Sequence, residues 1–171
     1  MALNLDPAAF WTRLEKLPVA HFEIGETVLL AGVSSGRILV LKSGRVEVVR
    51  DETRLAEVAE PGAVFGELSL LLDRPHTADV RALAPTEFYV ADAARLLADD
   101  PATLAYVAVL LARRLDATNQ ALIEVRQQLA AGQPASVIRG TVEKAAGFLN
   151  FAGASLVYAG YPYDPFEPAV P

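Results

Sequence analysis

The chain has 171 residues, 53% of them hydrophobic, and carries 15 Lys and Arg against 21 Asp and Glu, for a net charge of −6. This length predicts one domain, or one domain with an appendage, and the apolar content excludes an intrinsically disordered chain. The absence of cysteine excludes disulfides, thiolate metal sites and cysteine nucleophiles. The acidic charge disfavours nucleic-acid binding, which requires clustered Lys and Arg.

Residues 1–21 are predicted to form an N-terminal helical segment, with a short helix over residues 7–17. Within it, Phe10, Leu14 and Leu17 follow helical spacing, and Pro7 suits a first helical turn. The start of the chain lacks the apolar region of a secretory signal, and no run reaches the ~18–20 apolar residues of a membrane span. We therefore expect a cytoplasmic protein that does not enter a membrane.

Residues 22–100 are predicted to form a β domain. Six of the eleven glycines lie between residues 25 and 66, where short strand-like runs alternate with turns. Two of the turns, 42–44 and 51–53, are predicted to close hairpins. The predicted strands are residues 27–31, 37–41, 45–50, 54–59, 78–83 and 86–91. Many short strands at a spacing of ~8–12 residues favour a sandwich or barrel.

Residues 101–131 are predicted to form one long helix, with Asp100 as its N-cap and Pro101 as its first residue. Its apolar positions repeat with the 4-3-4-3 spacing of a coiled-coil seam. The seam residues are Leu104, Ala108, Leu111, Leu115, Thr118, Leu122, Val125 and Leu129. We interpret the seam as a homodimer interface over residues 104–129; the alternative is that the helix packs on the β domain of its own chain. Arg113 and Arg114 are expected to be solvated flanks of the seam.

Residues 132–171 are a tail rich in Gly, Pro and aromatic residues, with a second helical stretch predicted over residues 136–158. Arg139 and Lys144 are its only basic residues, so we expect no DNA-binding domain there. The apolar stretch 145–159 needs cover. Packing on its own chain is the default; the alternatives are an extended dimer interface, a cover for a ligand pocket, or docking on an unknown protein partner.

Residues 62–80 hold the pattern that is most informative about function. They predict a turn, a step at Gly66 into a short helix, a loop and a new strand. A glycine before a short helix lets a ligand approach the backbone, where free N–H groups favour an anion. Glu67 only accepts hydrogen bonds, which suits a sugar hydroxyl, while His76 and Thr77 return past the same turn as donors. An anion beside a hydroxyl describes a sugar phosphate.

From about residue 22 to residue 129 the sequence resembles the cyclic nucleotide-binding domain family, especially its Crp/Fnr type. The resemblance is carried by Phe22-x-x-Gly25-Glu26, the Gly44 turn, Phe65-Gly66-Glu67-Leu68, Pro75-x-Thr77-Ala78-x-Val80 and Leu111-Ala112-Arg113-Arg114-Leu115-x-x-Thr118. Together with the strand and helix pattern, it implies an α+β protein. Its core would be an antiparallel β-roll (a double-stranded β-helix or jelly roll) of about eight strands, with an N-terminal helix and a long C-terminal dimerisation helix.

The resemblance implies a ligand, cyclic AMP or cyclic GMP, and a set of residues that bind it. Gly66 and Leu68 would offer backbone N–H groups near the cyclic phosphate, and Thr77 would donate to it. Glu67 would accept from the ribose 2′-hydroxyl, and Thr118, with Asn119 of a second copy, would reach the purine. The expected ligand-binding residues are Gly66, Glu67, Leu68, His76, Thr77, Ala78, Thr118 and Asn119. No metal and no further cofactor is implied.

His76 departs from the family pattern, which has a phosphate-binding arginine at this position. Arginine is permanently charged and bidentate, whereas a neutral histidine offers one donor. Loss of a charged hydrogen bond, worth ~1.5–3 kcal/mol, lowers affinity by roughly 10–150-fold. Three outcomes are open: His76 donates when protonated, so that affinity rises as the pH falls through ~6.5; Arg74 replaces it; or the site no longer takes cyclic nucleotides.

We predict a non-enzymatic sensor or regulatory domain that binds a cyclic nucleotide and signals through its long helix. The sequence shows no Ser-His-Asp set, phosphate loop or metal-ligand spacing, which disfavours enzymes of those classes. The alternative is a degenerate domain used as a dimerisation and protein-interaction scaffold without nucleotide binding. A DNA-binding regulator is disfavoured by the charge and length of the tail.

Overall fold

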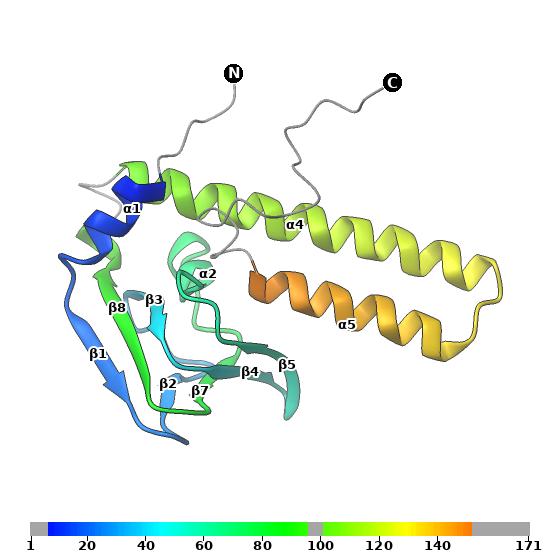
Figure 1. Ribbon diagram of the computed structural model, residues 1–171, viewed down its shortest axis with the longest axis horizontal. Coiled ribbons are helices and arrows are strands. Elements are labelled where there is room, and N and C mark those ends of the chain that lie inside the picture. Colours follow the sequence, from blue (N-terminus) through cyan, green and yellow to red (C-terminus); the bar gives the residue numbers. More distant parts are fainter. Residues whose placement is uncertain (1–6, 96–100, 152–171) are drawn as a thin grey trace.

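The computed structural model describes residues 7–95 and 101–151, in which two four-stranded antiparallel sheets form a roll flanked by helices (Figure 1). The strands are β1 (Val19–Phe22), β2 (Thr27–Leu29), β3 (Arg37–Ser43), β4 (Val46–Arg50), β5 (Thr53–Val58), β6 (Val64–Phe65), β7 (Asp79–Ala82) and β8 (Thr86–Asp92). The helices are α1 (Pro7–Leu14), α2 (Glu67–Leu71), α4 (Pro101–Ala130) and α5 (Ala135–Phe151). The predicted β-roll with an N-terminal helix and a long C-terminal helix is confirmed.

The two sheets enclose one apolar cluster, and the helices cover a second. The strand orders are β1-β8-β3-β6 in the first sheet and β2-β7-β4-β5 in the second. Alternate residues of β3 serve both clusters, because successive side chains of a strand point to opposite faces. Leu39 and Leu41 belong to the cluster between the sheets. Ile38 and Val40 belong to the cluster under the helices, so β3 ties the roll to its helical layer.

The six predicted strands are present, and the sequence pattern missed the short strands β1 and β6. Strand β1 pairs antiparallel with β8, from Val19 opposite Tyr89 to Phe22 opposite Thr86. Strand β1 therefore follows the helix that was predicted over residues 7–17 and is observed as α1, Pro7–Leu14. Strand β6 has only two residues and pairs with β3. Both strands are defined by distant pairing partners, and neither is long enough to show an alternating pattern.

One predicted hairpin is confirmed and the other is wrong. Strands β4 and β5 pair across the 51–53 turn, where Asp51 and Glu52 adopt positive φ values of 48° and 60°, as a two-residue hairpin turn requires. The 42–44 turn does not close a hairpin, because β3 and β4 lie in different sheets. Gly44, with φ 98°, makes this crossing possible: a Cβ there would lie 2.5 Å from the Pro85 carbonyl oxygen.

Helix α1 and the first half of α4 cover the first sheet. The Phe10 ring stacks on Tyr106 with centroids 3.6 Å apart, and Val107 and Leu110 are buried in the same cluster. These α4 residues are not the predicted seam residues, so the helix uses a different face to pack on its own roll. Helix α4 begins at Pro101 as predicted; the predicted N-cap, Asp100, lies outside the described residues.

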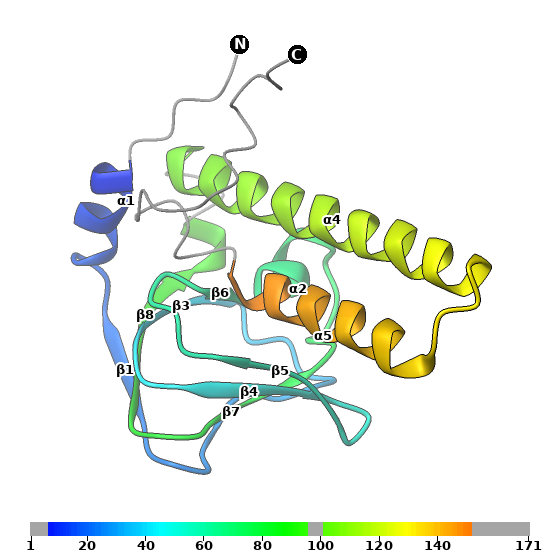
Figure 2. The ribbon, with the colours of Figure 1, turned by 45° about the vertical axis from the view of Figure 1, so that its right-hand side comes forward.

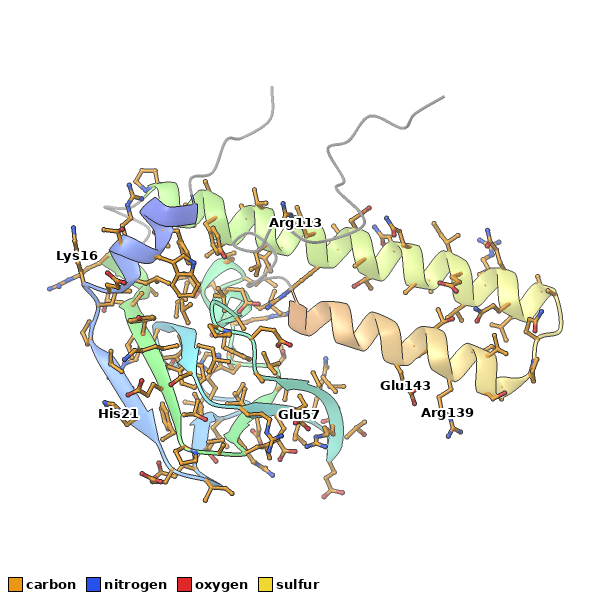
Figure 3. The ribbon with its side chains drawn as sticks, in the orientation of Figure 1. Lys16, His21, Glu57, Arg113, Arg139 and Glu143 are labelled. Atoms are coloured by element: carbon orange, nitrogen blue, oxygen red, sulfur yellow. The ribbon has the colours of Figure 1, made fainter. Side chains whose placement is uncertain are left out.

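Helix α5 runs back along the second half of α4 and lies beside β5 (Figures 1 and 2). Hydrogen bonds join the two helices: Gln128 Nε2 donates to Thr141 Oγ1 at 2.8 Å, and Thr141 Oγ1 donates to Glu124 Oε1 at 3.3 Å. Arg139 and Glu143 project from the side of α5 that faces away from α4 (Figure 3). The predicted second helical stretch is therefore present as α5 as far as Phe151, and residues 152–158 of that prediction lie outside the described residues. The cover of the apolar stretch 145–159 stays a prediction, because its side chains are not described.

None of the helices in the ranges that the structure covers is both long enough and apolar enough to cross a membrane.

Candidate functional site

The site begins at Gly66, which joins β6 to α2. Gly66 is the N-cap of α2 and has a φ of 86°, in the left-handed region that favours glycine. A Cβ at this position would lie 2.6 Å from the Arg37 carbonyl oxygen, so any side chain would collide with the backbone of β3. The fold itself therefore requires this glycine, whether or not a ligand approaches it.

Glu67, the first residue of α2, is buried and paired with a cation from α4. Its side chain is 6% exposed, and its Oε1 lies 2.6 Å from Nη1 of Arg114. Arg114 Nη2 also donates to the Val64 carbonyl oxygen at 3.3 Å, while its Nε is buried with no hydrogen-bond partner among the described residues. Burial raises the pKa of Glu67 above its ordinary value, and the charge and hydrogen bond of Arg114 oppose that rise.

Arg114 was expected to be a solvated flank of the seam, and this expectation is wrong. Its side chain is 17% exposed and is held against the roll by Glu67 and Val64. The sequence signal for this role is weak: Arg114 precedes seam residue Leu115 and lies one helical turn before Thr118. Only the docking of α4 across the first sheet shows that this flank faces α2 rather than solvent.

The ring of His76 also lies next to Gly66. The residue is buried, and its Cε1 would lie 3.6 Å from a Cβ on Gly66, so the ring stands beside this turn. Its Nε2 lies 2.9 Å from Ser35 Oγ. Burial lowers the pKa of His76 below its ordinary value of 6.5, so the ring is neutral at pH 7. Thr77 and Ala78 follow, half-buried, and lead into β7.

The structure brings the predicted site residues of the Gly66 turn together. Thr118 and Asn119 lie apart from them on α4. Gly66, Glu67 and Leu68 open α2, and His76 packs against the same turn. Thr118 is exposed on α4, and its hydroxyl donates to the Arg114 carbonyl oxygen at 2.7 Å. Asn119 is also exposed. Its predicted role involves a second copy of the chain, which this structure does not contain.

The cavity between α1 and the first sheet is too small for a nucleotide, and the described residues form no metal centre. A cavity of about 50 Å³ lies between α1, the first sheet and α4, lined by residues that include Phe10, Leu14 and Val107. A water occupies about 30 Å³ in the liquid, so this cavity has no room for a nucleotide. Within the described ranges, no group of three or more His, Asp or Glu side chains is placed to hold a metal ion.

Residues 19–98 match the family model of the cyclic nucleotide-binding domain. A CRP-like cAMP-activated global transcriptional regulator of Mycobacterium tuberculosis is 27% identical over 129 residues, which are 71% of this chain and 58% of the regulator. The chain thus spans little more than half the length of that relative.

Solved structures show the same fold. The catabolite activator protein of Thermus thermophilus matches with a TM-score of 0.58 and 22% identity, covering 87% of this chain and 82% of that protein. The N-terminal domain of a transcriptional regulator from Streptomyces coelicolor A3(2) matches with a TM-score of 0.52 and 27% identity, covering 68% of this chain and 89% of that domain.

Proposed function

Because residues 19–98 belong to the cyclic nucleotide-binding domain family, we propose that this chain binds a cyclic nucleotide, cyclic AMP or cyclic GMP, at the Gly66 turn. It acts as a non-enzymatic sensor whose signal passes through α4. The observation that carries the proposal is the convergence of Gly66, Glu67 and His76 on one turn, with Arg114 joining that turn to α4.

The residues at the turn fit a sugar phosphate. Glu67 is a buried acceptor, which suits the ribose 2′-hydroxyl, and Arg114 holds its carboxylate in place through Oε1. The backbone N–H groups of Gly66 and Leu68 and the Thr77 hydroxyl supply neutral donors for the cyclic phosphate. Thr118 lies on the same face of α4, one turn beyond Arg114, and would leave its hydrogen bond to the Arg114 carbonyl oxygen to reach the purine.

His76 makes the proposed binding dependent on pH. Burial lowers the pKa of the free ring, so the protonated form appears only as the pH falls below 6.5. A protonated ring beside the Gly66 turn attracts the phosphate, and a bound anion in turn favours the proton. Affinity therefore rises as the pH falls. Arg74 is exposed, whereas His76 is buried with its ring beside the Gly66 turn, which favours His76 as the donor.

We propose that α4 transmits the effect of ligand binding to the dimer interface. A ligand that engages Glu67 perturbs the partner of Arg114, and Arg114 lies next to Leu115 in the seam. Leu115, Leu122 and Leu129 are 62%, 67% and 61% exposed in the single chain, which leaves the second half of the seam free for a second copy. We propose a homodimer through residues 104–129. A ligand shifts it only by binding one arrangement of the helices better than another.

The test is calorimetric titration of the purified chain with cyclic AMP and cyclic GMP at pH 6 and pH 8. Denatured protein is checked by mass spectrometry for ligand carried through purification. We expect micromolar binding that is tighter at pH 6. His76→Arg should bind roughly 10–150-fold tighter at pH 8 and lose the pH dependence. His21→Arg, a change at the other histidine of the chain, is the matched control and should behave like the wild type.

Absence of binding by both the wild type and His76→Arg, in protein free of carried ligand, would contradict the proposal. With the dimer intact, that result would favour a scaffold that has lost its ligand. Binding by His76→Arg alone would mean that the fold retains the site and that one residue removes the ligand.

A further inference from the structure

The loop of residues 32–36, which precedes β3, is fastened to His76 through the backbone. His76 N–H donates to the Val33 carbonyl oxygen at 3.0 Å, and Gly32 N–H donates to the His76 carbonyl oxygen at 2.9 Å. This pair of hydrogen bonds fixes the position of His76 Cα against the loop. The direction of the ring is then decided by its side-chain partner.

That partner is Ser35, whose Oγ lies 2.9 Å from His76 Nε2. The same oxygen accepts a hydrogen bond from Arg37 N–H at 3.3 Å. A hydroxyl has one proton to donate and lone pairs to accept. The Arg37 N–H takes one lone pair of this oxygen, and in one arrangement the hydroxyl gives its proton to Nε2. The reverse arrangement, with Nε2–H donating to Ser35, would leave the hydroxyl proton to solvent.

The tautomer of neutral His76 depends on which of these two arrangements is present. A neutral imidazole carries one N–H, and a ring that accepts at Nε2 carries its proton on Nδ1. Among the described residues, the structure gives Nδ1 no hydrogen-bond partner, and Nδ1 is not among the polar atoms that are sealed from solvent without one. When Ser35 donates to Nε2, Nδ1–H is the one ring donor of neutral His76 that is left for a ligand.

We infer that Ser35 is a positioning residue of the ligand site: it orients His76 and selects the Nδ1–H tautomer, so that the neutral ring donates one hydrogen bond to the ligand's phosphodiester anion. This inference rests on the proposed function and names how a site with His76 in place of arginine takes its anionic ligand. Without Ser35 the ring is free to place an unprotonated, acceptor nitrogen toward the phosphate, which would repel it.

The first experiment measures the tautomer without any ligand. Long-range ¹H–¹⁵N NMR spectra at pH 8 report which ring nitrogen carries the proton, and only two histidines have to be told apart. We expect the Nδ1–H form for His76 in the wild type and in Ser34→Ala, the matched control next in the chain. In Ser35→Ala we expect a shift toward the Nε2–H form. A wild-type His76 that is Nε2–H overturns the inference.

The second experiment is a double-mutant cycle in cyclic AMP affinity at pH 8. Loss of one neutral hydrogen bond corresponds to a decrease of about 2- to 10-fold, which we expect for Ser35→Ala and not for Ser34→Ala. In the His76→Arg background Ser35→Ala should have no effect, because arginine has no tautomer to select. An equal loss in both backgrounds would mean that Ser35 only supports the loop, and would overturn the inference.

The two experiments separate the inference from the function on which it rests. Failure of both the wild type and His76→Arg to bind cyclic AMP or cyclic GMP overturns the proposed function. The NMR spectra report the tautomer of His76 whether or not the chain binds a cyclic nucleotide.

Discussion

The two halves of α4 carry one heptad repeat, apolar except at Thr118, but lie in different surroundings. In the first half, Tyr106, Val107 and Leu110 are 2% or less exposed and pack on the first sheet with α1. In the second half, Leu115, Leu122 and Leu129 are each more than 60% exposed. Arg114 stands at the border between the halves, where it reaches Glu67 in α2.

This difference separates two interpretations of the helix that looked exclusive from its sequence. Packing on the chain's own β domain is correct for the first half, whose buried residues Tyr106, Val107 and Leu110 lie outside the seam. The exposed seam of the second half is what a second copy would cover, since an apolar stripe of this kind is unfavourable in water. Leu111, a seam residue, packs partly on the chain's own core, so the seam changes partner between Leu111 and Leu115.

The largest effect is expected at the border. Arg114→Met should lower the free energy of unfolding by about 3–5 kcal/mol, because it leaves the buried Glu67 carboxylate without its cation. Urea denaturation followed by circular dichroism measures the loss. Arg113→Met, the neighbouring arginine, is the control and should cost about 0.5 kcal/mol or less. Adding Glu67→Gln to Arg114→Met should recover part of the stability. Equal losses for the two arginines would contradict the role of the ion pair.

The next prediction compares one leucine from each half. Leu110→Ala should cost about 2–5 kcal/mol, because Leu110 is fully buried and its removal leaves a cavity. Leu122→Ala, 67% exposed, should cost about 0.5 kcal/mol or less in dilute protein, where association contributes least. The measurement is again urea denaturation. Similar losses at both positions would show that the two halves do not differ as described.

Association itself is tested with charges on the exposed seam. Leu115→Glu combined with Leu122→Glu should weaken the dimer at least about tenfold, because carboxylates would face each other across the seam. Light scattering at tens of micromolar gives the mass. Ile123→Glu is the matched control: Ile123 is 57% exposed but lies outside the seam, so its variant should stay dimeric. A monomeric wild type, or a double variant that stays dimeric, would remove the seam as the interface.

The smallest effect on stability is expected at Thr118. Its hydroxyl bonds to its own helix and its side chain is exposed, so Thr118→Ala should change the free energy of unfolding by about 0.5 kcal/mol or less. If Thr118 reaches the purine, its loss should still lower cyclic nucleotide affinity about 2- to 10-fold, measured by calorimetry. Gln120→Ala, at an exposed position of the same helix, should leave affinity unchanged. Unchanged affinity in Thr118→Ala would exclude this residue from the site.

Much of the fold could be predicted because its signals are local. The turn and strand pattern placed six strands, and the apolar period with Pro101 placed the long helix. The prediction failed where pairing is non-local: β1 and β6 are too short to carry a pattern, and the 42–44 turn has the residues of a hairpin but joins two sheets. A hairpin and a crossing between sheets use the same turn chemistry, and only the strand partners distinguish them.

The candidate site divides in the same way. The sequence by itself determined that Gly66, Glu67 and His76–Ala78 fall at a turn, a helix start and a strand entry, since each depends on neighbouring residues. Only the tertiary structure decided that Arg114 meets Glu67, 47 residues away, and that Ser35 meets His76, 41 residues away. The physical reason is that such contacts depend on how α4 and the loop before β3 pack on the roll. Packing of this kind leaves no periodic trace in either segment.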